Sequence, residues 1–222
     1  MPDPKTLFNA CTGQGPLLTW YDPNEGRMEL SGRVVGNWLI KLANLLTTEM
    51  GMLPGEVLRI DTPPHWKSCL VALAASSCGI VVDATSQEPD VVVSDTPQAA
   101  DDFPAAREVL LLEAASLPLK YRGEVAWPCR DLLVEVRGMS DELEADLSPA
   151  FAEMILPGGI HLRSPLPQPS SPRALALHAP YSEKVLAAAL ANVCGGGRLL
   201  VSPEPLSAER YAAEGTTPLL GG

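Results

Sequence analysis

The sequence contains no long hydrophobic run and no segment that resembles an export signal. Its longest apolar stretch, residues 69–82, is shorter than the roughly 20 residues that a membrane-spanning helix needs, and Ser76 and Gly79 interrupt it. The segment from Met1 to Lys5 has neither the basic part nor the apolar part of a secretion signal. We therefore expect a cytoplasmic protein.

Cysteines are few, and their spacing excludes a disulfide framework and a zinc site. The chain has 5 of them, an odd number, and none forms a Cys-x-x-Cys pair or stands at metal-ligand spacing from a histidine. In a reducing cytoplasm we expect free thiols. The five residues are Cys11, Cys69, Cys78, Cys129 and Cys194.

The motifs of a hydrolase and of a dinucleotide-binding turn are also missing. No Gly-x-Ser-x-Gly segment is present in the sequence. The glycine triplet at 195–197 follows a predicted helix and precedes a predicted strand, which reverses the order of a dinucleotide-binding turn, so we interpret it as a helix end. His178 follows a predicted strand and could face a cleft, but an ordinary hydrogen-bonded histidine is the simpler interpretation.

Negative charge is concentrated in the middle third of the chain. The sequence carries 16 basic and 27 acidic residues, a net charge of −11. Residues 82–153 hold 5 of the basic and 16 of the acidic side chains, whereas residues 1–81 hold 6 and 7, and residues 154–222 hold 5 and 4. A surface of this sign repels nucleic acid and anionic lipid, so we expect neither as a partner. It is either a solvated face or a docking surface for a basic partner.

Apolar periodicity predicts three substantial helices. Between residues 31 and 50, apolar side chains recur at helical spacing opposite a polar stripe, with Ser31 as the N-cap and Gly51 as the stop. Two prolines open a second helix over 65–78, which is apolar or small on nearly every side and should be buried. The third predicted helix spans 182–194.

Short apolar runs without polar alternation separate these helices. Such runs are typical of parallel strands that are covered on both faces. The order of elements predicts an α/β fold with a mostly parallel sheet flanked by helices. We place strands at 57–60, 80–83, 91–94, 109–112, 132–136, 174–178 and 198–201, and a short helix at 148–156.

Residues 157–173 form the least regular part of the chain. Five of the 22 prolines lie here, so the segment cannot donate a regular ladder of hydrogen bonds. We interpret it as a loop or linker inside a single domain that spans residues 1–222.

Four short segments follow one another in a characteristic order. They are a strand with Leu18-Thr19-Trp20-Tyr21, a helix with Ala43-Asn44-Leu45-Leu46, and turns at Pro54-Gly55-Glu56-Val57 and Ser77-Cys78-Gly79-Ile80. Farther on, Leu177-His178-Ala179-Pro180 precedes a helix and a glycine turn. This order resembles the front of the adenylate-forming superfamily, the AMP-binding acyl-CoA synthetases and peptide-synthetase adenylation domains. The nearest likeness is to a short actinobacterial family of unknown function.

The resemblance implies an ATP-binding loop that is rich in Ser, Thr and Gly and ends in Pro-Lys, whose N–H groups and lysine hold the phosphates. Its place is taken here by 157–173, where prolines supply no N–H and the cations are Arg163 and Arg173. The family's Tyr-Gly-x-Thr-Glu motif, ribose-binding aspartate and C-terminal domain with the catalytic lysine would lie beyond this chain. Because adenylation needs a magnesium–triphosphate clamp, we expect no independent adenylating activity.

We therefore predict a non-catalytic relative of the adenylate-forming enzymes that binds a small ligand or a protein partner. We assign no catalytic, cofactor-binding or metal-binding residues and expect no cofactor. A ligand cleft should lie at the carboxyl ends of the strands. Two alternatives stay open: an acyl-adenylating enzyme completed by another chain, and an acidic docking module. An exposed apolar face would favour a protein partner or a homodimer.

Overall fold

The computed structural model describes residues 6–22, 26–115, 117–145, 155–156, 160–161, 174–178 and 183–218. Strands and helices alternate along most of these residues. The strands are β1 (Pro16–Asp22), β2 (Gly26–Ser31), β3 (Val57–Asp61), β4 (Val81–Val82), β5 (Val91–Ser94), β6 (Glu108–Leu111), β7 (Cys129–Asp131), β8 (Ile155–Leu156), β9 (Ile160–His161), β10 (Ala174–Leu177), β11 (Arg198–Val201) and β12 (Thr216–Pro218). The helices are α1 (Thr6–Ala10), α2 (Gly32–Asn44), α3 (Trp66–Ser77), α4 (Ala99–Asp102), α5 (Leu132–Gly138), α6 (Glu183–Cys194) and α7 (Ala208–Ala213).

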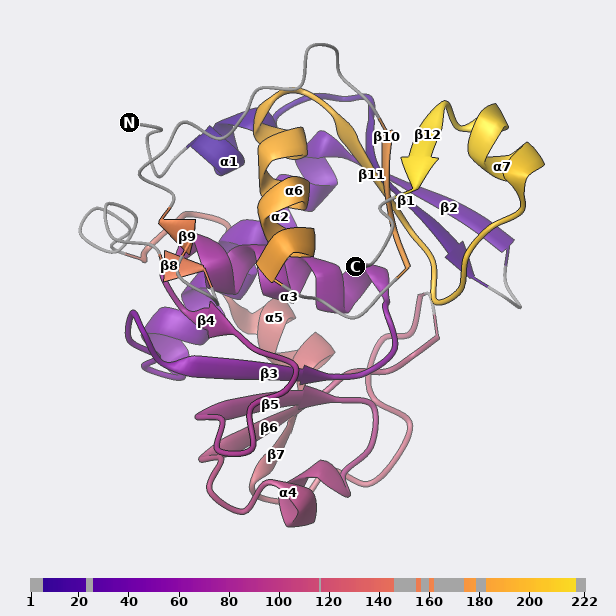
Figure 1. The fold of residues 1–222 in the computed structure, drawn as a ribbon. Coiled ribbons are helices and arrows are strands. Elements are labelled where there is room, and N and C mark those ends of the chain that lie inside the picture. The colour runs from indigo at the N-terminus through magenta and orange to yellow at the C-terminus, as the bar shows by residue number, and fades with distance from the viewer. Residues whose placement is uncertain are drawn as a thin grey trace.

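All of these strands except β8 and β9 form two five-stranded sheets, and α2, α3 and α6 lie between them (Figure 1). The first sheet has the order β12-β10-β11-β1-β2, parallel except for the β1–β2 hairpin. The second has the order β4-β3-β5-β6-β7 and is parallel throughout. The predicted α/β class with mostly parallel strands is confirmed, and the strands divide between two sheets.

The first long helix follows its predicted course. The Ser31 hydroxyl accepts a hydrogen bond from the Val34 N–H at 3.4 Å, as an N-cap should. After α2 the chain continues as a π-helical segment, Leu45–Glu49. There the Thr47 and Thr48 hydroxyls donate to carbonyls one turn back, at 2.7 and 2.5 Å. Such back-bonding competes with the regular ladder, which accounts for the wider last turn.

Helix α3 is the centre of the molecule. Every residue from Trp66 to Ser77 is buried, as the even apolar distribution predicts. His65 and Ser68 form a reciprocal capping box at its start. The helix ends at Ser77 with Cys78 as its C-cap, and the next residue, Gly79, has a φ of 76°, in the left-handed region that favours glycine.

The second sheet is covered on both faces. Val91 and Val93 on β5 pack into the main core with the helices, whereas Val92 between them packs with Phe103 and Leu111 in a second core. Consecutive strand residues point to opposite faces, so an unbroken valine run fills two cores at once.

One predicted strand is wrong. Residues 132–136 belong to helix α5, and the strand is the preceding β7. The Asp131 carboxylate accepts hydrogen bonds from the N–H groups of Leu133 and Val134, at 2.9 and 3.3 Å. This N-cap starts a helix although the run is rich in valine and leucine, because it satisfies the first N–H groups of the turn.

Two further predictions fall largely outside the described residues. The helix predicted at 148–156 is wrong at its end, because Ile155–Leu156 pair as β8 with β9 in a small antiparallel sheet. The predicted loop at 157–173 is described only at Ile160–His161, which form β9. Within the described parts of the chain, no helix has the length and apolar character to cross a bilayer.

Candidate functional site

A cleft lies at the carboxyl ends of strands from both sheets. It consists of two hollows, of about 390 and 210 Å³, that share Asp22 and Pro203; we call them together the strand-end cleft. The larger hollow is lined by Tyr21, Asp22, Ser202, Pro203, Glu204, Pro205, Leu206, Ser207 and Arg210. The smaller one is lined by Trp20, Asp22, Thr62, Pro63, Pro64, His65, Asp95, Leu112, Ala114 and Pro203.

Strand topology explains why these residues meet. Strand β1 ends at Asp22 and β11 ends just before Ser202, and the two strands are parallel neighbours. In the second sheet, Thr62, Asp95 and Leu112 each directly follow the end of a parallel strand. Open parallel sheets place ligands at this edge because the loops that follow the strands converge there.

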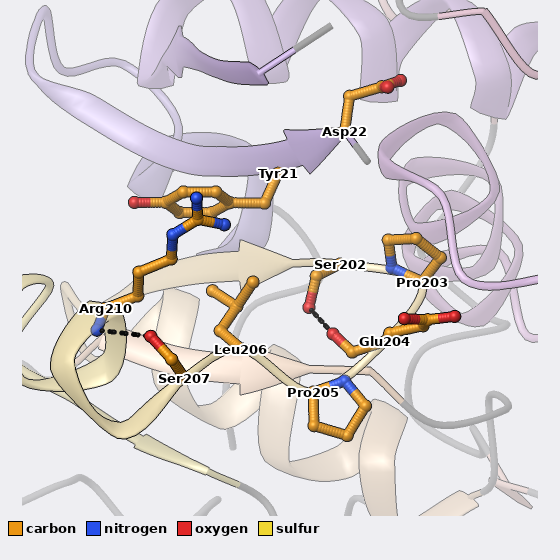
Figure 2. Close-up of a pocket in the computed structure, with 9 residues that line it drawn as sticks. All are labelled: Tyr21, Asp22, Ser202, Pro203, Glu204, Pro205, Leu206, Ser207 and Arg210. Atoms are coloured by element: carbon orange, nitrogen blue, oxygen red, sulfur yellow. Dashed lines mark hydrogen bonds between the residues drawn. The ribbon is translucent and has the colours of Figure 1, made fainter. Parts of the chain in front are cut away.

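The larger hollow is lined by charged side chains of both signs (Figure 2). Arg210 lies beside Tyr21, Glu204 lies on the loop that follows Ser202, and the Asp22 carboxylate points away from both. The Arg210 guanidinium sits over the Tyr21 ring, 5.5 Å from its centroid. Contact of this kind holds an arginine in place while leaving its N–H edge open for a ligand.

The loop from Ser202 to Ser207 is fixed by local hydrogen bonds. The Ser202 N–H donates to the Leu177 carbonyl at 3.0 Å, and its hydroxyl donates to the Glu204 carbonyl at 2.7 Å. The Leu206 N–H donates to the Tyr211 hydroxyl at 3.0 Å. The floor of the larger hollow is therefore built before any ligand arrives.

His178, the histidine considered from the sequence, contacts Tyr211 of α7. Its Nδ1 is 3.4 Å from the Tyr211 hydroxyl, and it is not among the residues that line either hollow. The glycine turn after α6 is also confirmed as a helix end, with Gly196 at a φ of 83°. Neither feature belongs to the strand-end cleft.

In the smaller hollow, His65 is an uncharged wall. Its ring lies 4.6 Å from that of Trp20, centroid to centroid, and its Nδ1 accepts a hydrogen bond from the Lys67 N–H at 3.1 Å. Burial, reinforced by the positive charge of Lys67, lowers the pKa of His65 from 6.5 to about 3. The imidazole is therefore neutral at physiological pH. It caps helix α3 and lines the smaller hollow.

Lys67 fixes the segment of the wall that contains Ala114. Its side chain is buried, and its ammonium donates to the carbonyls of Glu113 and Ala115 at 2.6 Å each. Ala114, between these two acceptors, lines the hollow. The sequence interpretation missed this role, although a lysine inside a helix predicted to be buried on all sides is itself a signal, since a buried ammonium needs acceptors.

Glu214 holds in place Tyr21, which lines the larger hollow. Its carboxylate accepts hydrogen bonds from Arg27 Nε at 2.8 Å and from the Tyr21 hydroxyl at 2.9 Å. The Arg198 guanidinium donates to its carbonyl at 2.6 Å. The hydrogen bond from Arg27 lowers the pKa of Glu214, so the carboxylate is charged and the Tyr21 ring is held from behind.

The cysteines are structural. All five are free, and burial raises the pKa of Cys69 and Cys78 to about 12, so these thiols are not nucleophiles. Among the described residues, no group of three histidine, cysteine or carboxylate side chains is placed to hold a metal ion.

Part of the negative charge in the middle third has structural partners. Arg130 forms ion pairs with Glu108 and Glu135 of this third, at 3.1 and 2.7 Å, and with Glu49 of the first third at 2.7 Å. Asp131, as described above, caps α5. These carboxylates hold the second sheet and its neighbours together and are not free to attract a partner.

Comparison with known proteins places the fold. No family model matches the sequence. The "TIGR03089 family protein" of Mycobacterium tuberculosis is 31% identical over 109 residues, which cover 46% of this chain and 45% of that protein. The chain spans less than half of this curated relative.

Solved structures match almost the whole chain. An acyl-CoA synthetase of Brucella canis gives a TM-score of 0.65 at 14% identity, over 96% of this chain and 47% of that one. A long-chain-fatty-acid-CoA ligase of Archaeoglobus fulgidus gives 0.71 at 13% identity, over 97% and 50%. The N-terminal domain of FACL13 from Mycobacterium tuberculosis gives 0.65 at 13% identity, over 96% and 60%. At these identities the likeness shows the fold.

Proposed function

Because this chain has the fold of the N-terminal part of acyl-CoA synthetases, we propose that it is a non-catalytic relative of the adenylate-forming enzymes and binds a small polar ligand in the strand-end cleft. The observation that carries the proposal is the meeting of two hollows at Asp22 and Pro203, where strands of both sheets end. A concave site with an apolar wall and a few convergent polar groups is the usual form of a small-molecule site.

The charges of the cleft argue against a nucleoside triphosphate as the ligand. Among the described residues that line it, Asp22, Asp95 and Glu204 are acidic and Arg210 is basic. A triphosphate needs several cations and converging N–H groups, and three carboxylates repel it. The buried ammonium of Lys67 already donates to two carbonyls.

The sequence supports the same conclusion. In adenylate-forming enzymes a loop rich in Ser, Thr and Gly and ending in Pro-Lys holds the phosphates, whereas residues 157–173 of this chain carry five prolines and no lysine. Proline has no N–H to offer a phosphate oxygen. The chain therefore keeps the scaffold of the fold and lacks a recognisable phosphate loop.

Three assays test the proposal. Isothermal titration with ATP and magnesium should give no measurable heat of binding, and pyrophosphate exchange with a panel of carboxylic acids should stay at background while an acyl-CoA synthetase run in parallel is active. A fragment screen followed by two-dimensional NMR should shift the resonances of Trp20, Tyr21 and Asp22. Binding of ATP, or exchange by the chain alone, would refute the non-catalytic assignment, and fragments that shift only residues far from the cleft would refute the ligand site.

A second candidate function is an adenylating enzyme completed by another chain. The observation that favours it is that the matched synthetases extend about twice as far as this chain, which spans 47% and 50% of the Brucella canis and Archaeoglobus fulgidus proteins. To test this candidate, the chain is isolated from its native cells together with the proteins that are bound to it. Pyrophosphate exchange by that complex, but not by the isolated chain, would favour this candidate over the first.

A further inference from the structure

The smaller hollow of the strand-end cleft has mostly apolar walls. Its apolar lining consists of Trp20, Pro63, Pro64, Leu112, Ala114 and Pro203. Its volume of about 210 Å³ exceeds that of an engineered apolar cavity of roughly 150 Å³ that binds benzene. It lies below the roughly 300 Å³ at which sites for drug-sized ligands begin. The hollow therefore has room for a single six-membered ring.

Polar groups that line the hollow are engaged inside the protein. The Thr62 hydroxyl donates to the carbonyl of the following residue at 2.9 Å. The Nδ1 of His65 accepts from the Lys67 N–H at 3.1 Å, and the Asp95 carbonyl accepts from the Tyr121 hydroxyl at 3.0 Å. These contacts fix the loops that follow β3 and β5, and they occupy groups that a ligand could otherwise bind.

The charges around the hollow disfavour an ionic ligand. Among the described residues that line it there is no lysine or arginine, and burial keeps His65 neutral by lowering its pKa to about 3. An anion would meet the carboxylates of Asp22 and Asp95 without a compensating cation. A cation gains little in return for leaving water, because Asp22 already has an interaction within the protein and Asp95 is exposed to solvent.

Rigid rings form much of the wall. Trp20 and His65 lie with their rings tilted by 52° and their centroids 4.6 Å apart. Pro63, Pro64 and Pro203 add pyrrolidine rings, which fix the backbone φ and have little conformational freedom to lose when a ligand binds. Walls of this kind favour a rigid, flat ligand, and aromatic rings in tilted or offset contact attract one another beyond the effect of the buried area.

From these features we propose that the ligand of the strand-end cleft is an uncharged aromatic molecule whose ring occupies the smaller hollow. The inference rests on the proposed role of the cleft as a ligand site. A hydroxyl or amide substituent on the ring has space in the larger hollow, which adjoins the smaller one at Asp22 and Pro203. A charged analogue carries its charge into an apolar space, and an aliphatic analogue lacks the flat π face.

The experiment compares four probes of nearly equal size. The intact chain is titrated with benzamide, benzoate, benzylamine and cyclohexanecarboxamide, and two-dimensional NMR follows the indole N–H of Trp20. Trp127, which is 78% exposed and lines neither hollow, is the control resonance. We expect benzamide to bind about tenfold more tightly than benzoate and benzylamine, and about threefold more tightly than cyclohexanecarboxamide.

A variant tests whether the ring lies in the smaller hollow. Ala114→Leu places a larger side chain on the wall, at a position that is exposed and therefore tolerant of substitution. It should weaken benzamide binding at least tenfold. Ala126→Leu, at an exposed alanine in the same connection between β6 and β7, is the matched control and should leave binding unchanged. Thermal unfolding of both variants checks that the fold is kept.

The outcomes separate this inference from the proposed function. If benzoate, benzylamine or cyclohexanecarboxamide binds as tightly as benzamide, or if Ala114→Leu binds benzamide unchanged, the aromatic ligand is refuted while the ligand cleft stands. If none of the four probes binds but screening fragments shift cleft resonances, the result is the same. If neither probes nor fragments reach the cleft, both proposals fail.

Discussion

The Arg27 guanidinium lies 2.8 Å from the carboxylate of Glu214, a residue 187 positions farther along the chain. The pair joins the β1–β2 hairpin to the segment that follows α7, and Glu214 is only 6% exposed. Tyr21 donates to the same carboxylate, so one buried acid fixes the ring over which Arg210 lies. The shape of the larger hollow depends on this acid.

Replacing Glu214 by Gln should destabilise the protein by about 1 to 2 kcal/mol, because the buried acceptor loses its charge while Arg27 stays partly exposed to solvent. The free energy of unfolding in urea measures the effect. Glu29→Gln is the matched control, since Glu29 pairs with the same guanidinium at 2.6 Å but on the exposed side. We expect that variant to lose less than about 0.5 kcal/mol. Equal losses in the two variants would contradict the account of a buried clasp.

The same carboxylate gives a pH dependence of defined sign. The hydrogen bond from Arg27 lowers the pKa of Glu214 below its ordinary value of 4.5, so the folded state holds the charged form more firmly than the unfolded state does. The stabilisation is complete above pH 4.5 and is lost as the pH falls through the lower pKa of the folded state. Unfolding curves measured down this range should converge for the wild type and Glu214→Gln. A difference that grows on acidification would rule the mechanism out.

The lowered pKa of His65 predicts a second loss of stability on acidification, one that begins at a higher pH than the loss from Glu214. The pKa of His65 falls from 6.5 in the unfolded chain to about 3 in the folded one, chiefly through burial. Below pH 6.5 the unfolded state takes up a proton that the folded state refuses, so stability decreases by about 1.4 kcal/mol per pH unit until the folded pKa is approached. His65→Asn keeps an N-cap residue. Its free energy of unfolding should depend less on pH between pH 6 and pH 4, by roughly the contribution of one titrating side chain. Proton NMR that showed the His65 ring titrating near its ordinary pKa in the folded protein would overturn this prediction.

Lys67→Met should loosen the wall of the smaller hollow. The methionine fills similar space but leaves the carbonyls of Glu113 and Ala115 without their donor, which costs about 2 to 4 kcal/mol. Hydrogen–deuterium exchange should rise around residues 113–115 beyond the rise seen elsewhere. Lys120→Met, at an exposed lysine in the same connection, is the control and should leave exchange there unchanged. Unaltered protection in Lys67→Met would show that the ammonium does not hold this wall.

The helices were predictable because their signals are local. The helix from residue 31 carries its own N-cap and apolar stripe, and α3 shows its burial in its composition. The run at 132–136 was wrongly predicted to be a strand because valine and leucine fit a short strand as well as a short buried helix. Asp131, immediately before the run, was the available sign of a helix start, and its carboxylate decides the outcome.

The candidate site was predictable only as a location. Parallel strands bring their carboxyl ends together whatever their sequence, so the edge of the sheets could be named in advance. The side chains at that edge depend on which strands are neighbours. Asp22 and Pro203 meet because β1 pairs with β11, which sets Leu18 beside Leu199, and no local pattern encodes this long-range pairing.

A helix without a solvent face also constrains how the molecule comes apart. Helix α3 lies between the two sheets, so neither sheet can leave it without exposing side chains that are all buried in the native state (Figure 1). Separation of the halves and melting of the helix are thus one event, and heat or urea should unfold both sheets in a single cooperative transition. A ligand that binds in the strand-end cleft would then raise the unfolding midpoint of the entire protein.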